Sequence, residues 1–561
     1  LASVTNLTVN GGATFSIASD AVVNPFDAEK ANVYLDYGST LSVPGSVTVK
    51  SVHYRTERDG AWTKLPSGTR VCDGTIPQLV GGGSLTVPSS KTNVPATWTA
   101  GGADSDVSTA ENWSNDGEYA AEGSLAPTFA AAGTEATVSG PLGFYGITFD
   151  APNDFTVRAT DESAAIMMSG DSIRSVISEA ETERTYSLDV PLNVSEGLGE
   201  LVVEAASNTV VKLRDIVSFP DVKVVGSKGR VEISGTNVFG GRIEVGCSNA
   251  AGGIDGTTAN RTTQLRLSGL IGTPNHVDYG EISNSTGPHT LAANAGNVAD
   301  NGAAAPLVLA GADVELPVYS NGRASSRVTV ETAADTTNAI TGFFLTDSSL
   351  SQALRLGDGS VLSFLGGVYI KHGLTLYGAG TVRFGRSLAS RAYFLGCEGT
   401  MEFIESEAYS SSYSGKFGGC YVYGLNSVVR FTADNAFKNG GVVFRSYGGV
   451  LDLGATRQRF NRIHTLWSSS KGSGEITGEA GSVIEITESV PEEIKSTTNI
   501  CCRVTGGVGF EMTGAGTLLL QKQAFASTGD LTVTNGVLEL AEDASWLNGT
   551  NFTARGVGTL R

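Results

Sequence analysis

Short alternating stretches that end at glycine run through most of this chain. Four to seven residues carry an apolar side chain at every second position before a glycine, as in RVEISG (230–235), GTVRFG (380–385) and GVLDLG (449–454). Such alternation buries one face of a β-strand and leaves the other face in water. Glycine, which accounts for 72 of the 561 residues, permits the turns between the strands. The chain is therefore predicted to be all-β.

Residues 158–185 are the main exception to this pattern. They are rich in helix-forming residues, but Gly170 and Asp171 interrupt the stretch. Because glycine inside a helix costs about 1 kcal/mol relative to alanine, we expect a loop here with no more than a short helix.

The strand pattern returns at intervals in the low twenties. YFLGCEGTMEF (393–403) is followed by KFGGCYVYGLNSVVRF (416–431), and their cysteines, Cys397 and Cys420, lie 23 residues apart. This interval suits one coil of a parallel β-helix, which holds two or three short strands and their turns. The predicted fold is a right-handed parallel β-helix, a solenoid. A row of β-sandwiches is the alternative, and it is less favoured because only 16 prolines and few linkers separate the strands.

The two ends of the sequence resemble one another. Residues 7–43 align with residues 531–561: both begin Leu-Thr-Val, and both end in a strand that follows glycine. Only the N-terminal copy continues, through residues 47–87. We interpret the chain as parts of two modules.

Three segments follow from this repeat. Residues 1–90 are expected to be the β-rich tail of a preceding module, either a β-sandwich or the end of a β-helix. Residues 91–96 would be a linker, inside a stretch rich in Pro, Ser and Thr. Residues 97–561 would be a β-helix module that is truncated at its C-terminal end.

Charge and composition exclude several classes of partner. The net charge is −19, from 38 basic and 57 acidic residues, which disfavours nucleic acid and anionic lipid. No apolar run approaches the ~18 residues of a membrane-spanning helix, so no membrane insertion by this segment is expected. Six cysteines are too few for a disulfide-dense domain.

Several segments carry a common order of glycine, alternating strand, Asn or Phe, glycine and a second strand. The two clearest are residues 229–246 and 514–540. They resemble the autotransporter-associated β-strand repeat, and residues 97–114, 143–157 and 448–487 are similar to other parts of the same passengers. This resemblance, in patches from residue 96 to 561, implies a β-helix, export, and an extracellular or bacterial cell-surface location.

Candidate functional residues are few. Tyr409, Tyr413, Tyr421 and Tyr423 crowd into residues 407–424, and an exposed strip of aromatic rings could stack on sugars. A core ladder with a serine-rich turn is the alternative. Cys397 and Cys420 are expected to be thiols stacked on adjacent coils, or a disulfide if their Cα atoms lie within about 7 Å.

No catalytic set, metal site or cofactor site is predicted. Glycoside hydrolysis needs two carboxylates at a fixed separation, and turn acids are the simpler interpretation of every acidic pair. The pairs are Asp104/Asp106, Asp150/Asp154, Asp161/Glu162 and Glu485/Glu488. The five histidines have no metal-ligand spacing.

We therefore expect an extracellular or cell-surface structural or adhesive protein: a stalk, an adhesin or a filament subunit. Its expected partners are further copies of itself, in an array or filament, or surface glycans. One alternative is a carbohydrate-active β-helix enzyme, a polysaccharide lyase or glycoside hydrolase, which needs two or more acids in one cleft. The other is a receptor-binding protein like a phage tailspike.

Overall fold

The protein is described here from a computed structural model of residues 1–561. The described residues are 4–17, 26–27, 30–43, 46–65, 70–72, 76–81, 84–87, 94–114, 125–130, 133–176, 182–194, 200–218, 221–226, 229–246, 263–273, 291–295, 305–322, 327–346, 352–370, 373–389, 393–396, 398–408, 410–411, 419–422, 424–437, 441–444, 448–461, 463–464, 474–487, 497–521, 526–540 and 550–561. The chain divides into two units, residues 1–246 with 260–292 and residues 247–259 with 293–561.

Strands dominate the first unit, which also holds a single described turn of 3-10 helix, η1 (Ala110–Asn112). Its strands up to residue 98 are β1 (Asn6–Val9), β2 (Thr14–Ser16), β3 (Asn32–Leu35), β4 (Thr40–Ser42), β5 (Ser46–Thr48), β6 (Ser51–Tyr54), β7 (Thr63–Lys64), β8 (Arg70–Cys72), β9 (Leu79–Val80), β10 (Ser84–Thr86) and β11 (Val94–Trp98). The others are β12 (Leu125–Phe129), β13 (Glu135–Val138), β14 (Pro141–Phe149), β15 (Phe155–Ala159), β16 (Ala165–Ser175), β17 (Arg184–Asp189), β18 (Leu192–Val194), β19 (Glu200–Ala205), β20 (Thr209–Arg214), β21 (Ile216–Ser218), β22 (Asp221–Gly226), β23 (Arg230–Ser234), β24 (Thr236–Phe239), β25 (Ile243–Gly246) and β26 (Gln264–Gly272).

The unit boundary falls within β27 (Leu291–Ala295), and the second unit continues with strands alone among its described residues. They begin with β28 (Leu307–Val314), β29 (Val318–Gly322), β30 (Arg327–Thr332), β31 (Thr337–Ile340), β32 (Phe344–Thr346), β33 (Gln352–Leu356), β34 (Val361–Phe364), β35 (Val368–Ile370), β36 (Leu374–Tyr377), β37 (Thr381–Phe384), β38 (Ser387–Ala389), β39 (Tyr393–Gly396), β40 (Thr400–Phe403), β41 (Ser410–Ser411) and β42 (Gly419–Val422). They end with β43 (Val428–Phe431), β44 (Gly441–Phe444), β45 (Gly449–Asp452), β46 (Arg457–Phe460), β47 (Ile463–His464), β48 (Gly474–Thr477), β49 (Val483–Ile486), β50 (Thr497–Ile500), β51 (Arg503–Val504), β52 (Gly509–Met512), β53 (Thr517–Leu520), β54 (Leu531–Val533), β55 (Val537–Leu540), β56 (Phe552–Ala554) and β57 (Thr559–Leu560).

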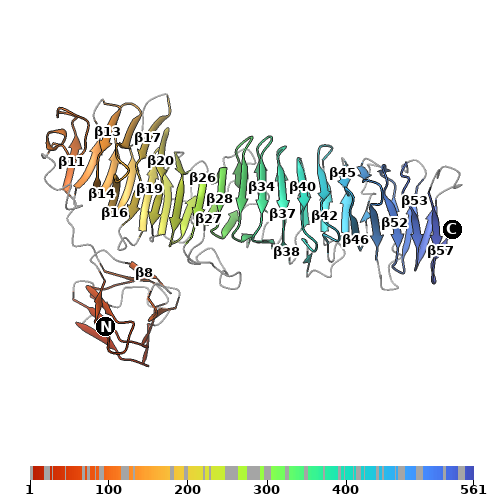
Figure 1. The fold of residues 1–561 in the computed structure, drawn as a ribbon, viewed down its shortest axis with the longest axis horizontal. Coiled ribbons are helices and arrows are strands. Elements are labelled where there is room, and N and C mark those ends of the chain that lie inside the picture. Colours follow the sequence, from red (N-terminus) through yellow and green to blue (C-terminus); the bar gives the residue numbers. More distant parts are fainter. Residues whose placement is uncertain are drawn as a thin grey trace. The chain divides into compact units, whose positions relative to one another are not determined.

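Parallel pairing between successive coils organises both units, which confirms the prediction of an all-β chain with parallel strands. Through much of each unit a strand pairs with the strand three places later in the chain, for example β17 with β20 and β20 with β23. Figure 1 shows such strands lying side by side in chain order within each unit. Three strands therefore make one coil there, an arrangement consistent with a β-helix.

Equivalent side chains stack in columns through these coils. In the first unit, one buried column is Val157, Leu188, Leu213, Ile233 and Leu267, each paired in register with the next. Because each strand alternates its side chains between faces, the parallel register carries one apolar row inward on every coil. The rows of neighbouring coils pack on one another and form the core.

The second unit has a column of stacked phenylalanines. Phe364, Phe384, Phe403 and Phe431 are register partners, with ring centroids 5.5, 5.5 and 5.6 Å apart. Phe384 pairs with Phe403 and Phe403 with Phe431, so successive coils take 19 and 28 residues. The predicted interval in the low twenties lies between these lengths.

The prediction of a loop with no more than a short helix at residues 158–185 is wrong. β16 (Ala165–Ser175) occupies the middle of this stretch, and β17 begins at Arg184. Ile166 and Met168 are fully buried, and β16 pairs in parallel with β14 on one side and with β18 and β19 on the other. The helix propensity of Ala and Met is a weak preference, and this cross-strand packing overrides it.

The N-terminal strands form three small sheets. β1, β3 and β6 pair in parallel, and β7 adds antiparallel to β6. β2, β4 and β9 are parallel throughout, while β10 pairs parallel with β5 and antiparallel with β8. Fully buried residues of these sheets include Val33, Leu35, Leu41 and Val52. β11 begins at Val94, so the last three residues of the expected linker belong to a strand.

The aligned ends of the sequence have the same strand pairing. β1 pairs in parallel with β3 and β2 with β4, and in the same way β54 pairs with β56 and β55 with β57. Leu7 lies beside Val33 and Leu531 beside Phe552. Each end therefore contains two consecutive coils of the same two-strand design.

No described helix is long and apolar enough to span a membrane.

Candidate functional site

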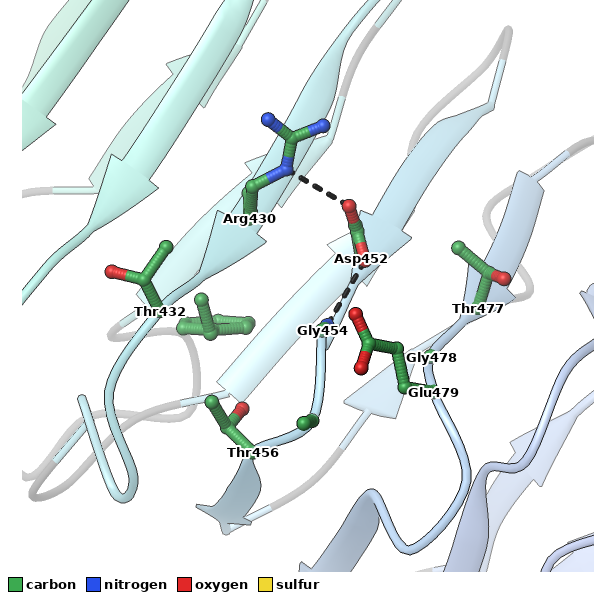
Figure 2. Close-up of a pocket in the computed structure, with 10 residues that line it drawn as sticks. Arg430, Thr432, Asp452, Gly454, Thr456, Thr477, Gly478 and Glu479 are labelled. Carbon is green, nitrogen blue, oxygen red and sulfur yellow. Dashed lines mark hydrogen bonds and ion pairs between the residues drawn. The ribbon is translucent and has the colours of Figure 1, made fainter.

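An open groove of about 660 Å³ lies on the second unit, where β43, β45 and β48 end on successive coils. This volume falls within the ~300–1,000 Å³ of small-ligand sites. Its polar lining comes from Arg430, Thr432, Asp452, Thr456, Thr477 and Glu479, which Figure 2 shows around a turn at Gly454. We call this feature the Gly454 groove.

A missing side chain opens the groove. Gly454 lies two residues after Asp452, whose register partners are Arg430 on the preceding coil and Thr477 on the next, and Glu479 N donates to Gly454 O at 2.6 Å. Gly454 has a φ of +53°, a conformation that favours glycine. A Cβ atom there would lie 3.2 Å from Phe431 O. Glycine thus permits the turn and adds no side chain to the groove that it lines.

One wall of the groove belongs to a ladder of alternating charge. Arg383, Glu402, Arg430 and Asp452 are register partners on four successive coils. Arg430 donates from Nε to Asp452 Oδ2 at 2.9 Å and from Nη1 to Glu402 Oε1 at 3.2 Å. The hydrogen bond that Arg430 donates to Asp452 raises the pKa of Arg430 above its usual value. The ladder is neutral overall and holds its side chains in place.

Glu479 supplies the groove's unneutralised charge. Its side chain is exposed and turns toward Gly454, beside Asp452 (Figure 2). Within the described part of the chain, the Glu479 carboxylate has no ion-pair partner, whereas Asp452 accepts hydrogen bonds from Arg430 Nε and from Gly454 N at 3.0 Å. The groove therefore presents one fixed carboxylate and one solvated carboxylate.

This geometry suits polar binding better than acid–base chemistry. A glycosidase needs one carboxyl group in apolar surroundings that keep it protonated as the acid. Asp452 is hydrogen-bonded to a guanidinium and a backbone N–H, and Glu479 lies in water. The threonine hydroxyl groups and the carboxylates can instead form hydrogen bonds with a hydroxylated ligand.

Comparison with known proteins adds no family to this description. No family model, no curated protein and no solved structure matches this chain. The function is therefore inferred from the geometry of the chain itself.

Three described acids of the sequence-predicted pairs, Asp104, Asp154 and Asp161, accept hydrogen bonds from backbone N–H or hydroxyl groups. Asp104 accepts hydrogen bonds from Asp106 N at 3.0 Å and from Thr109 Oγ1 at 2.8 Å. Asp154 accepts one from Thr185 N at 2.8 Å, and Asp161 accepts one from Ser163 N at 2.7 Å. Glu488 lies outside the described residues. In the described part of the chain, no group of three or more His, Cys, Asp or Glu side chains could hold a metal ion.

The predicted tyrosine strip falls almost wholly outside the described residues. Tyr409, Tyr413 and Tyr423 lie outside them. Tyr421 is in β42, where its backbone pairs with Leu395 on one side and Val443 on the other. Glycan stacking by these four residues stays a prediction.

The cysteine pair is described only at one partner. Cys420 is a fully buried free thiol whose register partners are Phe394 and Val442. Since Cys420 is free, it forms no disulfide in this structure. Cys397 lies outside the described residues, so its stacking on Cys420 stays a prediction. Burial raises the pKa of the Cys420 thiol far above its usual value, and this thiol is therefore poorly suited to nucleophilic chemistry.

A second charged cluster surrounds Glu485 in β49. Its side chain is only 6% exposed and accepts hydrogen bonds from Arg457 Nη2 at 2.9 Å and from Thr513 Oγ1 at 3.1 Å. Arg459 Nη2 lies 3.1 Å from Glu485 Oε1. Arg457 also forms an ion pair with Glu511. Burial alone would raise the pKa of Glu485, but the bonds from Arg457 and Arg459 outweigh it and lower the pKa.

Replacing Glu485 with glutamine is expected to destabilise the second unit at pH 7 by about 1–2 kcal/mol, because charge-assisted hydrogen bonds are lost from half-exposed arginines. The lowered pKa makes this stabilisation fully present above the ordinary glutamate value, and it disappears as the pH falls through the folded-state pKa. Denaturant unfolding of wild type and E485Q at pH 7 and pH 2.5 measures it.

The exposed turn residue Glu162 offers a matched control, and E162Q should change nothing at either pH. An equal destabilisation by E485Q at both pH values would show that the carboxylate charge is not the cause.

Proposed function

We propose that this chain is an extracellular or bacterial cell-surface protein with a structural and adhesive role: a stalk, adhesin or filament subunit. Its coils would form a right-handed parallel β-helix like that of autotransporter passengers. The observation that supports this most is the repetition of side-chain columns from coil to coil. In such an architecture each added coil repeats the contacts of the last one. The fold therefore produces a long stack with an extended surface, which suits a structural or adhesive role.

The charged surface supports the structural part of the proposal. On neighbouring coils Lys212, Glu232 and Arg266 are register partners, with alternating sign. The Arg383 to Asp452 ladder repeats this in the second unit. Exposed charges that neutralise one another between coils add little free energy per pair. They do select the register, because a slipped coil would bring like charges together.

The repeated pairing at the two ends supports self-association. The same parallel pairing joins β1 to β3 and β2 to β4 near one end, and β54 to β56 and β55 to β57 near the other. Placing β1 and β2 of one copy beside β56 and β57 of another would repeat, in direction and order, a contact that the chain already makes between β54–β55 and β56–β57. Coils of one design can stack on one another in this way.

The Gly454 groove weighs against the alternative of a hydrolase. Two acids line it, as that alternative requires, but Asp452 is bound to Arg430 and Glu479 is solvated. A binding role for this surface is compatible with adhesion to surface glycans.

Electron microscopy and sedimentation velocity of the 1–561 polypeptide test this proposal. We expect species of more than one copy that grow end to end as concentration rises. Leu560→Lys should reduce them, because it places a charge in β57, one of the strands that would make this contact. Leu425→Lys, at a residue 71% exposed in a turn, is the matched control and should have no effect. Single copies at every concentration would contradict the filament proposal.

A further inference from the structure

Three aromatic rings gather on the outer face of the sheet β1-β3-β6-β7. Tyr34 in β3 and His53 in β6 are register partners, and their rings stack with centroids 4.7 Å apart and planes 13° apart. Trp62, just before β7, meets Tyr34 edge-on at 5.7 Å and 89°. The neighbouring Val33 and Val52 are fully buried on the opposite face. The three rings therefore belong to the solvent side of this sheet, and we call them the aromatic platform.

The platform is open to solvent. Trp62 is 41% exposed, and Tyr37, in the turn after β3, is 49% exposed. Trp98 and Trp113, by contrast, are buried. Aromatic side chains usually bury most of their large surface, so a cluster left partly in water marks a surface available for a ligand.

A neutral ion pair forms one side of the platform. The Arg55 guanidinium lies 5.1 Å from the Trp62 ring centroid, and its Nε donates to Asp36 Oδ1. Asp36 also accepts hydrogen bonds from Tyr37 N at 2.6 Å and from Gly11 N at 3.3 Å. The bond from Arg55 lowers the pKa of Asp36 to about 2. Both groups are therefore charged at neutral pH, and their charges cancel.

Polar groups remain available around the rings. Within the described part of the chain, neither the Tyr34 hydroxyl nor the Trp62 indole N–H has a hydrogen-bond partner. The His53 ring uses Nε2 in its contact with Ser51 Oγ at 3.2 Å. A ligand on the platform can thus form hydrogen bonds at its edges while it packs on the rings.

We propose that the aromatic platform binds a neutral carbohydrate. The apolar face of a pyranose ring packs on an aromatic ring, and its hydroxyl groups hydrogen-bond at the rim. Arg55, Tyr34 and Trp62 supply donors for these hydroxyl groups. Asp36 neutralises Arg55, so the rim has no net charge to favour an anionic sugar, and the net charge of −19 opposes a phosphate-bearing ligand.

This inference rests on the adhesive part of the proposed function and names its ligand class. The filament proposal is tested by sedimentation, so either can fail without the other.

The test is isothermal titration of the 1–561 polypeptide at pH 7 with cellohexaose, maltohexaose and mannohexaose. We expect at least one to bind and Trp62→Ala to weaken that binding by at least about tenfold, the equivalent of one lost stacking contact. Leu425→Ala is the matched control, since Leu425 is an apolar side chain that is 71% exposed and lies in another part of the chain, and it should bind as wild type does. Tyr34→Phe removes one hydroxyl and keeps the ring, and should weaken binding about threefold to tenfold.

Thermal melting of each variant separates binding from folding. If W62A unfolds, Trp62→Tyr and Tyr34→Phe keep a ring at each position, and Y34F should still show its loss. The proposal is overturned if none of the three hexasaccharides binds at 10 mM, if W62A binds as tightly as wild type, or if L425A weakens binding as much as W62A does. Trp, Tyr and Arg also form protein-interface hot spots. Loss of self-association in W62A without any sugar binding would assign the platform to a protein partner instead.

Discussion

Phe403→Ala is expected to destabilise the second unit by about 3–5 kcal/mol, the usual cost of removing a buried phenylalanine. Phe403 is fully buried between Phe384 and Phe431, and the Phe437 ring lies 4.9 Å away. The cavity would interrupt the phenylalanine column on two coils at once. Close-packed strands on either side cannot collapse into it without breaking their register.

Hydrogen exchange of β37, β40 and β43 is the best measurement, because a coil stack can open locally before it unfolds globally. Exchange in these strands should accelerate far more than exchange in strands of the first unit. Phe403→Leu should have a smaller effect, and the exposed Leu425→Ala should stay within about 0.5 kcal/mol. A Phe403→Ala effect no larger than that of Leu425→Ala would contradict the packing argument.

Asn338→Leu is expected to cost about 2–4 kcal/mol, because it leaves buried backbone groups without partners. Asn338 is almost fully buried, and its Oδ1 accepts hydrogen bonds from Gly311 N at 2.8 Å and Ala312 N at 3.0 Å. Its Nδ2 donates to Thr336 Oγ1 at 3.0 Å and to Val361 O at 3.4 Å. One side chain thus links three successive coils.

Amide exchange at Gly311 and Ala312 reports this contact directly. Both amides should lose protection in Asn338→Leu, whereas Asn10→Ala, at an exposed turn position, should change neither their exchange nor the unfolding free energy. Unchanged protection of the two amides would show that another group takes over the hydrogen bonds. Asn237 makes an equivalent contact, accepting from Ile216 N at 2.9 Å, and should respond in the same way.

Sequence reasoning was most successful for local features. Alternation and glycine identified strands such as β23, β37 and β45, because period-2 burial is a property of a few adjacent residues. It failed at β16, where local helix propensity opposed the packing of Ile166 and Met168 against coils on either side. That packing partner comes from elsewhere in the chain, so no local pattern reveals it.

The candidate sites were harder to predict. Arg430, Asp452 and Glu479 lie on three coils, and their proximity depends on coil lengths that vary. The aromatic platform was missed for the same reason, since Tyr34, His53 and Trp62 belong to two coils and a following turn. A usable signal was present in the alternation of NVYL (32–35) and SVHY (51–54), which places Tyr34 and His53 opposite buried valines.

The sequence by itself determined the strand class, the turns and the faces that are buried, because these depend on the chemistry of neighbouring residues. The equivalence of β1–β4 and β54–β57 was also legible as a repeat. Only the tertiary structure decided which side chains meet from coil to coil. In a parallel stack those contacts depend on the length of every intervening turn, and one inserted residue moves a side chain to the other face or to another column. The Gly454 groove and the aromatic platform are both products of that register.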